Sequence, residues 1–301
     1  MQNIKVLDKY VRPLIGDCKL DKLSPSLMQT KINQFLKEVT GKRQTYKFIL
    51  SMIKRILKYG VALDLLTFNP MDKVIVQPVK STIHKEKQIK YYEKDQVNQI
   101  LIELDRLLAG GAWGDTVYAT YIKLLLFTGA RASEILALEW ADIDFTNQNM
   151  RINKTLSNNG KNVELPKTKG SIRTIEIDSG TIKTLKQWRK IQLTKCWELG
   201  INQQPKIIFY NISKHDYYHY KNMLRIHIEF CENTNIPYLG GLHCFRHTHA
   251  TMYINAGVDY KMLQERLGHE DISMTMNVYA RALSENKKSA LDNVVAFMKE
   301  A

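Results

Sequence analysis

A stretch without helical periodicity divides the chain into two unequal parts. Asn69-Pro70 ends a region of helical pattern, and residues 71–88 carry Pro78 and several lysines with no apolar repeat. Such a stretch is typical of a linker. Because 301 residues exceed one typical domain, two domains are expected. We therefore predict a helical domain over residues 1–75, a linker over 76–90 and a second domain over 91–301.

The first part of the chain carries a basic helical face. Ser24-Pro25 is typical of a helix start, and a longer helix is predicted from Gln44 to about Leu63. Residues 1–80 hold 15 Lys and Arg against 6 Asp and Glu, in a chain of net charge +14. This asymmetry suggests a polyanion partner, most simply nucleic acid, but the charge alone is equally compatible with a basic surface that binds no partner. The side chains expected to face DNA phosphates are Lys47, Lys54, Arg55 and Lys58.

The second part combines helices with a short β segment. From Tyr92 to Phe127 apolar residues recur at helical spacing, and Thr128-Gly129-Ala130 interrupts the pattern just before Arg131. Residues 148–178 instead indicate three short strands of one sheet, over residues 151–156, 163–165 and 172–177, and helical patterns return over 179–235. A tight turn at Asn158-Asn159-Gly160 joins the first two strands. The expected fold is mainly α with a small antiparallel β-sheet, an α+β protein.

Residues 243–279 gather side chains suited to reaction at a phosphate. His243 and Arg246 are three positions apart and fall on one face of an early helical turn. Leu267-Gly268 predicts a helix end, His269 follows at once, and Tyr279 lies ten residues further on. A free tyrosine is a poor nucleophile with a pKa of about 10. Cations and hydrogen-bond donors around a phosphate make it competent, and the surrounding residues are of that kind.

Two boxes in the sequence resemble those of the tyrosine recombinase (phage and mobile-element integrase) family. One is H-x-x-R-H from His243, followed by L-G-H and Tyr279; the other is Thr128–Leu136 with its Arg131. Both occur in the family's order, within residues 90–280. The resemblance implies a helical core-binding domain over 1–75 and a tyrosine-recombinase catalytic domain over 91–301. It also implies the catalytic residues Arg131, Lys167, His243, Arg246, His269 and Tyr279.

The resemblance further implies a reaction. In it, Tyr279 attacks a DNA phosphodiester to form a 3′-phosphotyrosyl link while Arg131 and Arg246 grip the non-bridging oxygens. A hairpin lysine protonates the leaving 5′-oxygen, and the K-T-x-x-S-x-R form favours Lys167, with Lys169 as the alternative. His243 assists proton movement at the tyrosine, and His269 bonds a phosphate oxygen. No metal and no cofactor are expected.

The same resemblance implies partners and a biological setting. The expected protein is a site-specific recombinase for integration or excision of a phage or conjugative transposon. Its partners are double-stranded DNA, further copies of itself in a tetrameric synapse, and accessory DNA-bending or directionality proteins. Lys169 and Arg173 of the hairpin are expected to contact DNA. A final helix with apolar Leu291, Val294, Val295 and Met298 is expected to be exchanged between subunits.

Other functions are weighed against this one. A chromosome-dimer resolvase of the Xer type shares the length and layout, although the K-T-K-G-S-I-R hairpin looks more like integrases of mobile elements. A type IB topoisomerase uses the same chemistry, and a non-catalytic DNA-binding regulator is the alternative from another class. Zinc on His243, Cys244, His247, His249 and His269 is disfavoured because an arginine interleaves with these ligands. Two departures from the family pattern, Ala280-Arg281 after the tyrosine and Gly241-Leu242 before His243, touch no reacting group.

Cysteine usage and hydropathy indicate the compartment. The four cysteines lack C-x-x-C spacing, which is typical of reduced thiols. No apolar run approaches about 18 residues, and the N-terminus lacks a signal pattern. We expect a cytoplasmic, nucleoid-associated protein of a bacterial or phage-infected cell, without a membrane partner.

Overall fold

The computed structural model describes residues 2–38, 43–76, 90–157, 160, 162–166, 169–203 and 205–268. The chain divides into two compact units, Met1–Lys87 and Gln88–Ala301. This division falls within residues 76–90, the span expected to be a linker. The predicted exchange helix around Leu291 lies outside the described residues. No helix among the described residues is long and apolar enough to cross a membrane.

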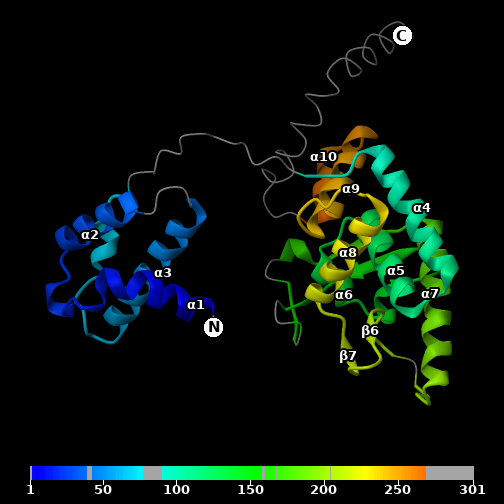
Figure 1. The fold of residues 1–301 in the computed structure, drawn as a ribbon, viewed down its shortest axis with the longest axis horizontal. Helices are drawn as coiled ribbons and strands as arrows, with labels where there is room; N and C mark the ends of the chain where they lie inside the picture. Colours follow the sequence, from blue (N-terminus) through cyan, green and yellow to red (C-terminus); the bar gives the residue numbers. More distant parts are fainter. Residues whose placement is uncertain are drawn as a thin grey trace, which may run out of the picture. The chain divides into compact units, whose positions relative to one another are not determined.

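All the regular elements described in the first unit are helices (Figure 1). Its elements are α1 (Gln2–Val6), a π-helix η1 (Leu7–Gly16), 3₁₀ turns η2 (Leu20–Lys22) and η3 (Pro70–Lys73), α2 (Pro25–Glu38) and α3 (Arg43–Ala62). As predicted, α2 begins at Ser24-Pro25, where the Ser24 hydroxyl accepts a hydrogen bond from the Leu27 N–H at 3.2 Å. The core of this unit consists mainly of the apolar stripes of α2 and α3, among them Met28, Ile32, Ile49 and Ile53.

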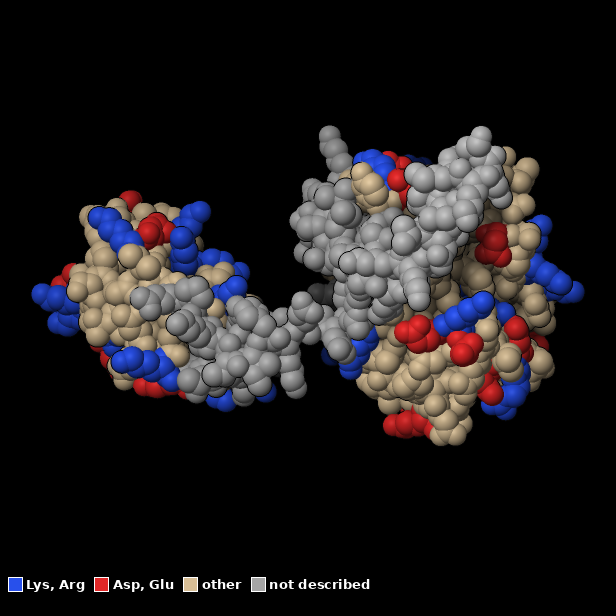
Figure 2. All heavy atoms as spheres, turned by 90° about the horizontal axis from the view of Figure 1, so that it is seen from above, with Lys and Arg blue, Asp and Glu red and all other residues tan. Residues whose placement is uncertain are grey.

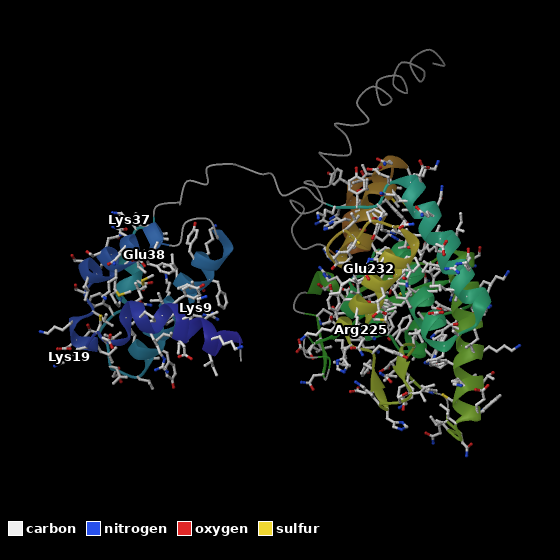
Figure 3. All side chains as sticks on the ribbon, viewed as in Figure 1. Lys9, Lys19, Lys37, Glu38, Arg225 and Glu232 are labelled. Atoms are coloured by element: carbon white, nitrogen blue, oxygen red, sulfur yellow. The ribbon has the colours of Figure 1, made fainter. Side chains whose placement is uncertain are left out.

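Basic side chains of the first unit lie at its surface. Lys47, Arg55 and Lys58 on α3 are exposed, and Lys54 is exposed although it is ion-paired with Asp72 at 2.8 Å. Lys and Arg are also prominent on the face of this unit seen in Figure 2. Figure 3 labels Lys19 and Lys37, two exposed lysines of the same unit that lie outside α3.

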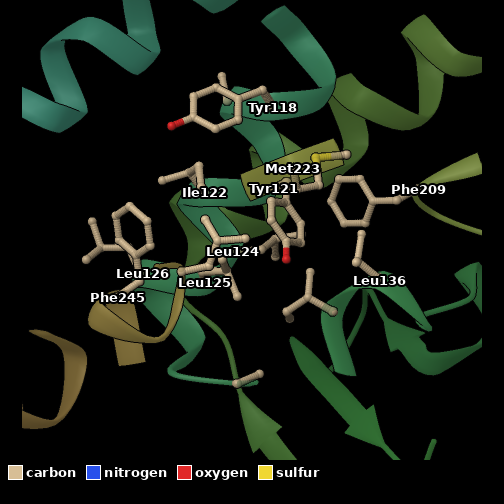
Figure 4. Packing of buried hydrophobic residues seen from close by; sticks show 14 of the residues in the cluster. Tyr118, Tyr121, Ile122, Leu124, Leu125, Leu126, Leu136, Phe209, Met223 and Phe245 are labelled. Atoms are coloured by element: carbon tan, nitrogen blue, oxygen red, sulfur yellow. The ribbon is translucent and has the colours of Figure 1, made fainter. Parts of the chain in front are cut away.

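The second unit is built around one helix that is buried on nearly every side. This helix, α5 (Trp113–Thr128), packs against α4 (Lys94–Gly110), α6 (Ala132–Leu136), α7 (Ser179–Glu198), α8 (Tyr220–Thr234) and α9 (His243–Asn255). Apart from Asp115 and Lys123 its residues are uncharged, and apolar residues occur on every side, as expected of a helix that is largely buried. Figure 4 shows Tyr121, Leu124 and Leu125 of α5 among Phe209 and Phe245 from distant parts of the chain.

Short antiparallel strands flank the helices of this unit. A three-stranded sheet has the order β1 (Ile143–Asp144), β2 (Asn149–Ile152), β5 (Arg173–Glu176), with Met150 opposite Ile175. Two separate pairs are β3 (Thr155–Leu156) with β4 (Val163–Glu164), and β6 (Tyr210–Asn211) with β7 (Asp216–Tyr217). The expected α+β class with small antiparallel sheets is confirmed.

One detail of the β segment differs from the expectation. Residues 151–156 were predicted as one strand in one sheet, but the structure ends β2 at Ile152 and starts β3 at Thr155, in another sheet. Between them Lys154 turns toward η4 (Trp140–Asp142) and pairs with Asp142 at 2.8 Å and Glu139 at 3.1 Å. This tertiary ion-pair cluster interrupts the strand.

The last described elements bring the sequence boxes together. α9 and α10 (Tyr260–Leu267) pack on each other, and α9 also packs along α5 (Figure 1). α10 ends at Gly268 in the left-handed conformation, with φ of 66°. α5 ends in the same way at Gly129, with φ of 65°. The ends of α5 and α10 and the start of α9 therefore define one corner of the second unit.

Candidate active site

Arg246 is the central side chain of this corner. It lies in the first turn of α9 and is only 2% exposed. Its Nη1 donates to the carbonyl oxygen of Gly129 at 2.9 Å, and its Nη2 donates to the carbonyl oxygen of Leu267 at 2.7 Å. Because the last carbonyls of a helix have no partner within the helix, the ends of α5 and α10 supply acceptors for a buried cation. Arg246 thus joins three segments that are far apart in the sequence.

Arg131 reaches the same corner from the start of α6. Its backbone N–H donates to Glu134 Oε2 at 2.9 Å, and its Nη1 donates to Glu134 Oε1 at 2.7 Å. Its Nη2 lies 3.4 Å from the carbonyl oxygen of Gly268. Gly268 directly follows Leu267, whose carbonyl oxygen accepts from Arg246. The side chain of Arg131 remains 36% exposed, so the guanidinium is held at one end and accessible to solvent at the other.

Gly129 permits this arrangement. Its positive φ disfavours residues with a side chain, and a Cβ added there would collide with the His249 ring and with Leu267. The main chain can therefore turn tightly between α5 and Arg131 while α9 packs directly beneath it.

Glu134 is a buried carboxylate between two arginines. It is 3% exposed and pairs with Arg131 on one side and with Nη2 of Arg173 at 2.9 Å on the other. Burial alone raises the pKa of Glu134, but the charges and hydrogen bonds of Arg173 and then Arg131 outweigh it, so the pKa is lowered. Glu134 is therefore ionised at neutral pH.

His243 stands at the start of α9 with its side chain exposed. Partial desolvation and then the charges of His247, Arg246 and Arg131 lower its pKa, against a smaller opposing effect of Glu134. Its ring meets the His247 ring edge-on, with centroids 4.7 Å apart. At neutral pH His243 is therefore an uncharged imidazole able to accept a proton.

His249 belongs to the support of the site and is 3% exposed. Its Nδ1 lies 2.8 Å from the Leu126 carbonyl oxygen, and its Nε2 accepts a hydrogen bond from Arg266 Nε at 3.1 Å. Burial, followed by the charge of Arg266, lowers its pKa to about 3. Both ring nitrogens are used, which removes His249 from the zinc ligand set considered above. Within the described ranges, no three His, Cys, Asp or Glu side chains are grouped to hold a metal ion.

The site is strongly cationic. Burial and the neighbouring charge of Arg131 lower the pKa of Arg246 to about 9, which still leaves it charged at pH 7. Arg131, Arg173 and Arg246 all act on the carboxylate of Glu134, which offsets part of their charge. Arg131, which Glu134 holds and which is 36% exposed, presents its guanidinium to solvent close to the charge of the buried Arg246. This arrangement suits an anion with planar or tetrahedral oxygens, such as a phosphodiester.

Several expected site residues are not placed. His269 and Tyr279 fall in residues 269–301, and Lys167 falls in 167–168; both spans lie outside the described residues. The backbone of Lys169 is described as the start of η5 (Lys169–Ser171), without its side chain. The Gly170 carbonyl oxygen lies 3.0 Å from where a Cβ on Gly268 would stand. The lysine-bearing loop therefore ends beside the turn that leads to His269.

Arg173 does not occupy the surface position expected of a DNA contact. Its side chain is 6% exposed. The sequence contained a signal for this burial. Alternate residues of a strand point to the same face, and Arg173 is two and four positions before the buried Ile175 and Ile177. This spacing places Arg173 on the inner face. Glu134, three residues after Arg131, is also buried and was not among the expected site residues.

The chain is similar to known integrases. The model of the Phage integrase family matches residues 90–286. The ICEBs1 integrase of Bacillus subtilis (strain 168) is 27% identical over 299 residues, which are 97% of this chain and 76% of that relative.

Solved structures show the same fold. The integrase of the Tn1549 transposon in complex with transposon right end DNA has a TM-score of 0.69 at 20% identity, covering 98% of this chain and 94% of that one. A lambda integrase tetramer bound to a Holliday junction has a TM-score of 0.60 at 16% identity, covering 92% and 71%.

Proposed function

The chain belongs to the phage integrase family of tyrosine recombinases, enzymes that cleave and rejoin DNA, and on that premise we propose the role of each residue in its site. The protein is a site-specific DNA recombinase of the integrase type. One observation carries the assignment of its site. Arg131 and Arg246, from two distant parts of the sequence, meet beside the Leu267-Gly268 turn, and the charges of both act on His243.

Arg131 and Arg246 bind the scissile phosphate. The contacts with Gly129, Leu267, Glu134 and Gly268 use only part of each guanidinium, and further N–H groups remain for the non-bridging oxygens. Because backbone and carboxylate contacts already fix both groups, little reorganisation is needed as charge builds on the phosphate. Removal of one such donor costs about 3 kcal/mol of transition-state stabilisation.

Tyr279 is the nucleophile. Its phenol oxygen attacks the phosphorus, the bond from phosphorus to the 5′-oxygen breaks, and a 3′-phosphotyrosyl link forms. His243, uncharged at neutral pH, receives the phenol proton. Lys167 donates a proton to the departing 5′-oxygen, with Lys169 as the alternative donor, and His269 bonds a phosphate oxygen. The reverse sequence with a new 5′-hydroxyl rejoins the strand.

DNA is gripped by the first unit as well. Lys47, Lys54, Arg55 and Lys58 on α3 are exposed and supply a phosphate-facing surface, and Lys169 adds a contact from the catalytic unit. The tetramer of the related lambda integrase on a Holliday junction supports assembly of several copies on DNA. The C-terminal helix around Leu291 is the segment proposed to pass between subunits.

A nicked suicide substrate tests the function. Wild-type protein should form a covalent DNA adduct that survives denaturing electrophoresis, whereas Tyr279→Phe should bind the same DNA and form none. The matched control is Tyr59→Phe, a highly exposed tyrosine on α3, which should form the adduct normally. An adduct retained by Tyr279→Phe would refute the assignment of the nucleophile.

The alternatives differ in outcome. A non-catalytic regulator would yield no adduct with any variant. A type IB topoisomerase would relax supercoiled DNA without exchanging strands between two sites. A resolvase of the Xer type would recombine chromosomal sites in preference to the ends of a mobile element. Sequencing the DNA trapped on the protein distinguishes these cases.

A further inference from the structure

Arg173 contacts three parts of the site at once. It lies at the start of β5 with its side chain turned inward. Its Nε donates to the Arg266 carbonyl oxygen at 2.6 Å, and its Nη1 donates to the Ser171 carbonyl oxygen at 3.1 Å. Its Nη2 pairs with Glu134 at 2.9 Å. It therefore links the end of the lysine-bearing loop, the turn before Gly268 and the carboxylate that holds Arg131.

The charges of this group explain why a second arginine is needed. Glu134 is buried, and a buried carboxylate is stable only when it is paired. With Arg131 as its sole partner, the pair would carry no net charge, and Arg131 would offer little attraction to a phosphate. With Arg173 present, the group of Arg131, Glu134 and Arg173 carries one net positive charge. Glu134 can then orient Arg131 without cancelling its charge.

We propose that Arg173 is a positioning residue of the recombination reaction. It neutralises Glu134, so that Arg131 keeps its positive charge for the scissile phosphate, and it fixes the 266–268 turn against the loop that ends at Gly170. It does not touch DNA itself. This inference rests on the proposed catalytic role of Arg131.

A charge-removal series on the full-length protein tests the inference. Arg173→Gln should slow single-turnover cleavage of the nicked substrate by about 10²-fold, the scale of one lost electrostatic contact. Arg173→Lys keeps the charge and loses the fork geometry, so its rate should fall between wild type and Arg173→Gln. The matched control is Arg106→Gln, an exposed arginine paired with Glu103 on α4, which should cleave as wild type does.

The decisive variant removes both charges. Glu134→Gln combined with Arg173→Gln leaves Arg131 with its full charge, so the double variant should cleave faster than Arg173→Gln alone. A residue that only supports the fold would give the opposite order, because two buried changes destabilise more than one. Thermal unfolding of all variants separates loss of folded protein from loss of rate.

Three results would overturn the inference. The first is cleavage by Arg173→Gln at the wild-type rate, and the second is a double variant that cleaves no faster than the single one. The third is a loss of DNA affinity in Arg173→Gln with a salt dependence reduced by about one phosphate contact. Arg131→Lys, measured in parallel, separates this failure from failure of the proposed function. If Arg131→Lys cleaves normally, the assigned site is wrong; if it is impaired while Arg173→Gln is not, only the role of Arg173 is wrong.

Discussion

The Arg246 guanidinium donates from Nη1 to the carbonyl oxygen of Gly129 at 2.9 Å, across 117 positions of sequence. This bond joins the two sequence boxes directly. The second bond of the same side chain, to Leu267, adds the turn that precedes His269. The position of the Arg246 guanidinium in the site therefore depends on how rigidly these backbone segments are held.

Gly129→Ala should destabilise the second unit by more than about 1 kcal/mol, because the new methyl group combines a positive φ with a collision against His249. Chemical denaturation followed by tryptophan fluorescence measures this, since all four tryptophans lie in the second unit. Gly114→Ala is the control. It lies in the first turn of α5 with no atom within 4 Å of its added Cβ, and it should be neutral or stabilising. Equal stability of the two variants would contradict the expectation.

Arg246→Lys should lower single-turnover cleavage by about 10²- to 10³-fold while DNA affinity changes little. A lysine carries the charge but cannot bond two carbonyls in divergent directions and still reach a phosphate. Cleavage of the nicked substrate and gel-shift titration give the two quantities. Arg189→Lys, on α7 beside Trp140, serves as a second arginine control and should cleave normally. Strong adduct formation by Arg246→Lys would count against the phosphate-binding role.

Acid should destabilise the second unit through its buried histidines. Burial lowers the pKa of His227 to about 4, below its ordinary value of 6.5. The unfolded chain therefore binds a proton at a higher pH than the folded chain does. As a result, the free energy of unfolding decreases as pH falls from about 6.5 toward 4. His227→Asn should flatten the dependence of unfolding free energy on pH by up to about 1.4 kcal/mol per pH unit.

The comparison for this pH experiment is His215→Asn. His215 is exposed in the β6–β7 turn with φ of 51°, a conformation that asparagine tolerates. That variant should retain the slope of the wild-type protein. An unchanged slope in His227→Asn would show that His227 is charged in the folded state.

Neutralising the α3 surface should weaken DNA binding in a salt-dependent way. Lys58→Gln and Arg55→Gln should each reduce the slope of log affinity against log salt by about one phosphate contact. Fluorescence anisotropy over a salt series measures both affinity and slope. The controls are Lys19→Gln and Lys37→Gln, at two exposed positions of the same unit outside α3 (Figure 3), and they should leave the slope unchanged. Equal losses from all four variants would indicate a diffuse charge effect instead of a binding face.

Much of this molecule could be predicted from sequence because its signals are local. The Ser24-Pro25 start, the helical stripes and the breaks at Gly129 and Gly268 are short-range patterns, and the structure confirms them. The convergence of Arg131, His243 and Arg246 was accessible through the family resemblance, because the spacing of the two boxes reflects their common site.

The long-range contacts could not be predicted in the same way. The split of the sheet at residues 153–154 depends on Lys154 finding Glu139 and Asp142, which no local pattern reveals. The burial of Arg173 was visible in strand alternation, but its charge suggested an outward position. Only the buried Glu134 explains why a cation lies on the inner face.

The hydrogen-bond partners of Arg246 also limit which second mutations can compensate for a change at this position. Both partners are main-chain carbonyl oxygens, which every residue type carries. A second substitution at position 129 or 267 therefore cannot change the charge or the reach of the acceptor to suit another side chain at position 246. The pairing of Arg173 with Glu134 is a contact between side chains, so a second mutation that removes the Glu134 charge can offset the loss of the Arg173 charge. A genetic screen for suppressors should therefore recover activity from defects at Arg173 and fail to recover it from defects at Arg246.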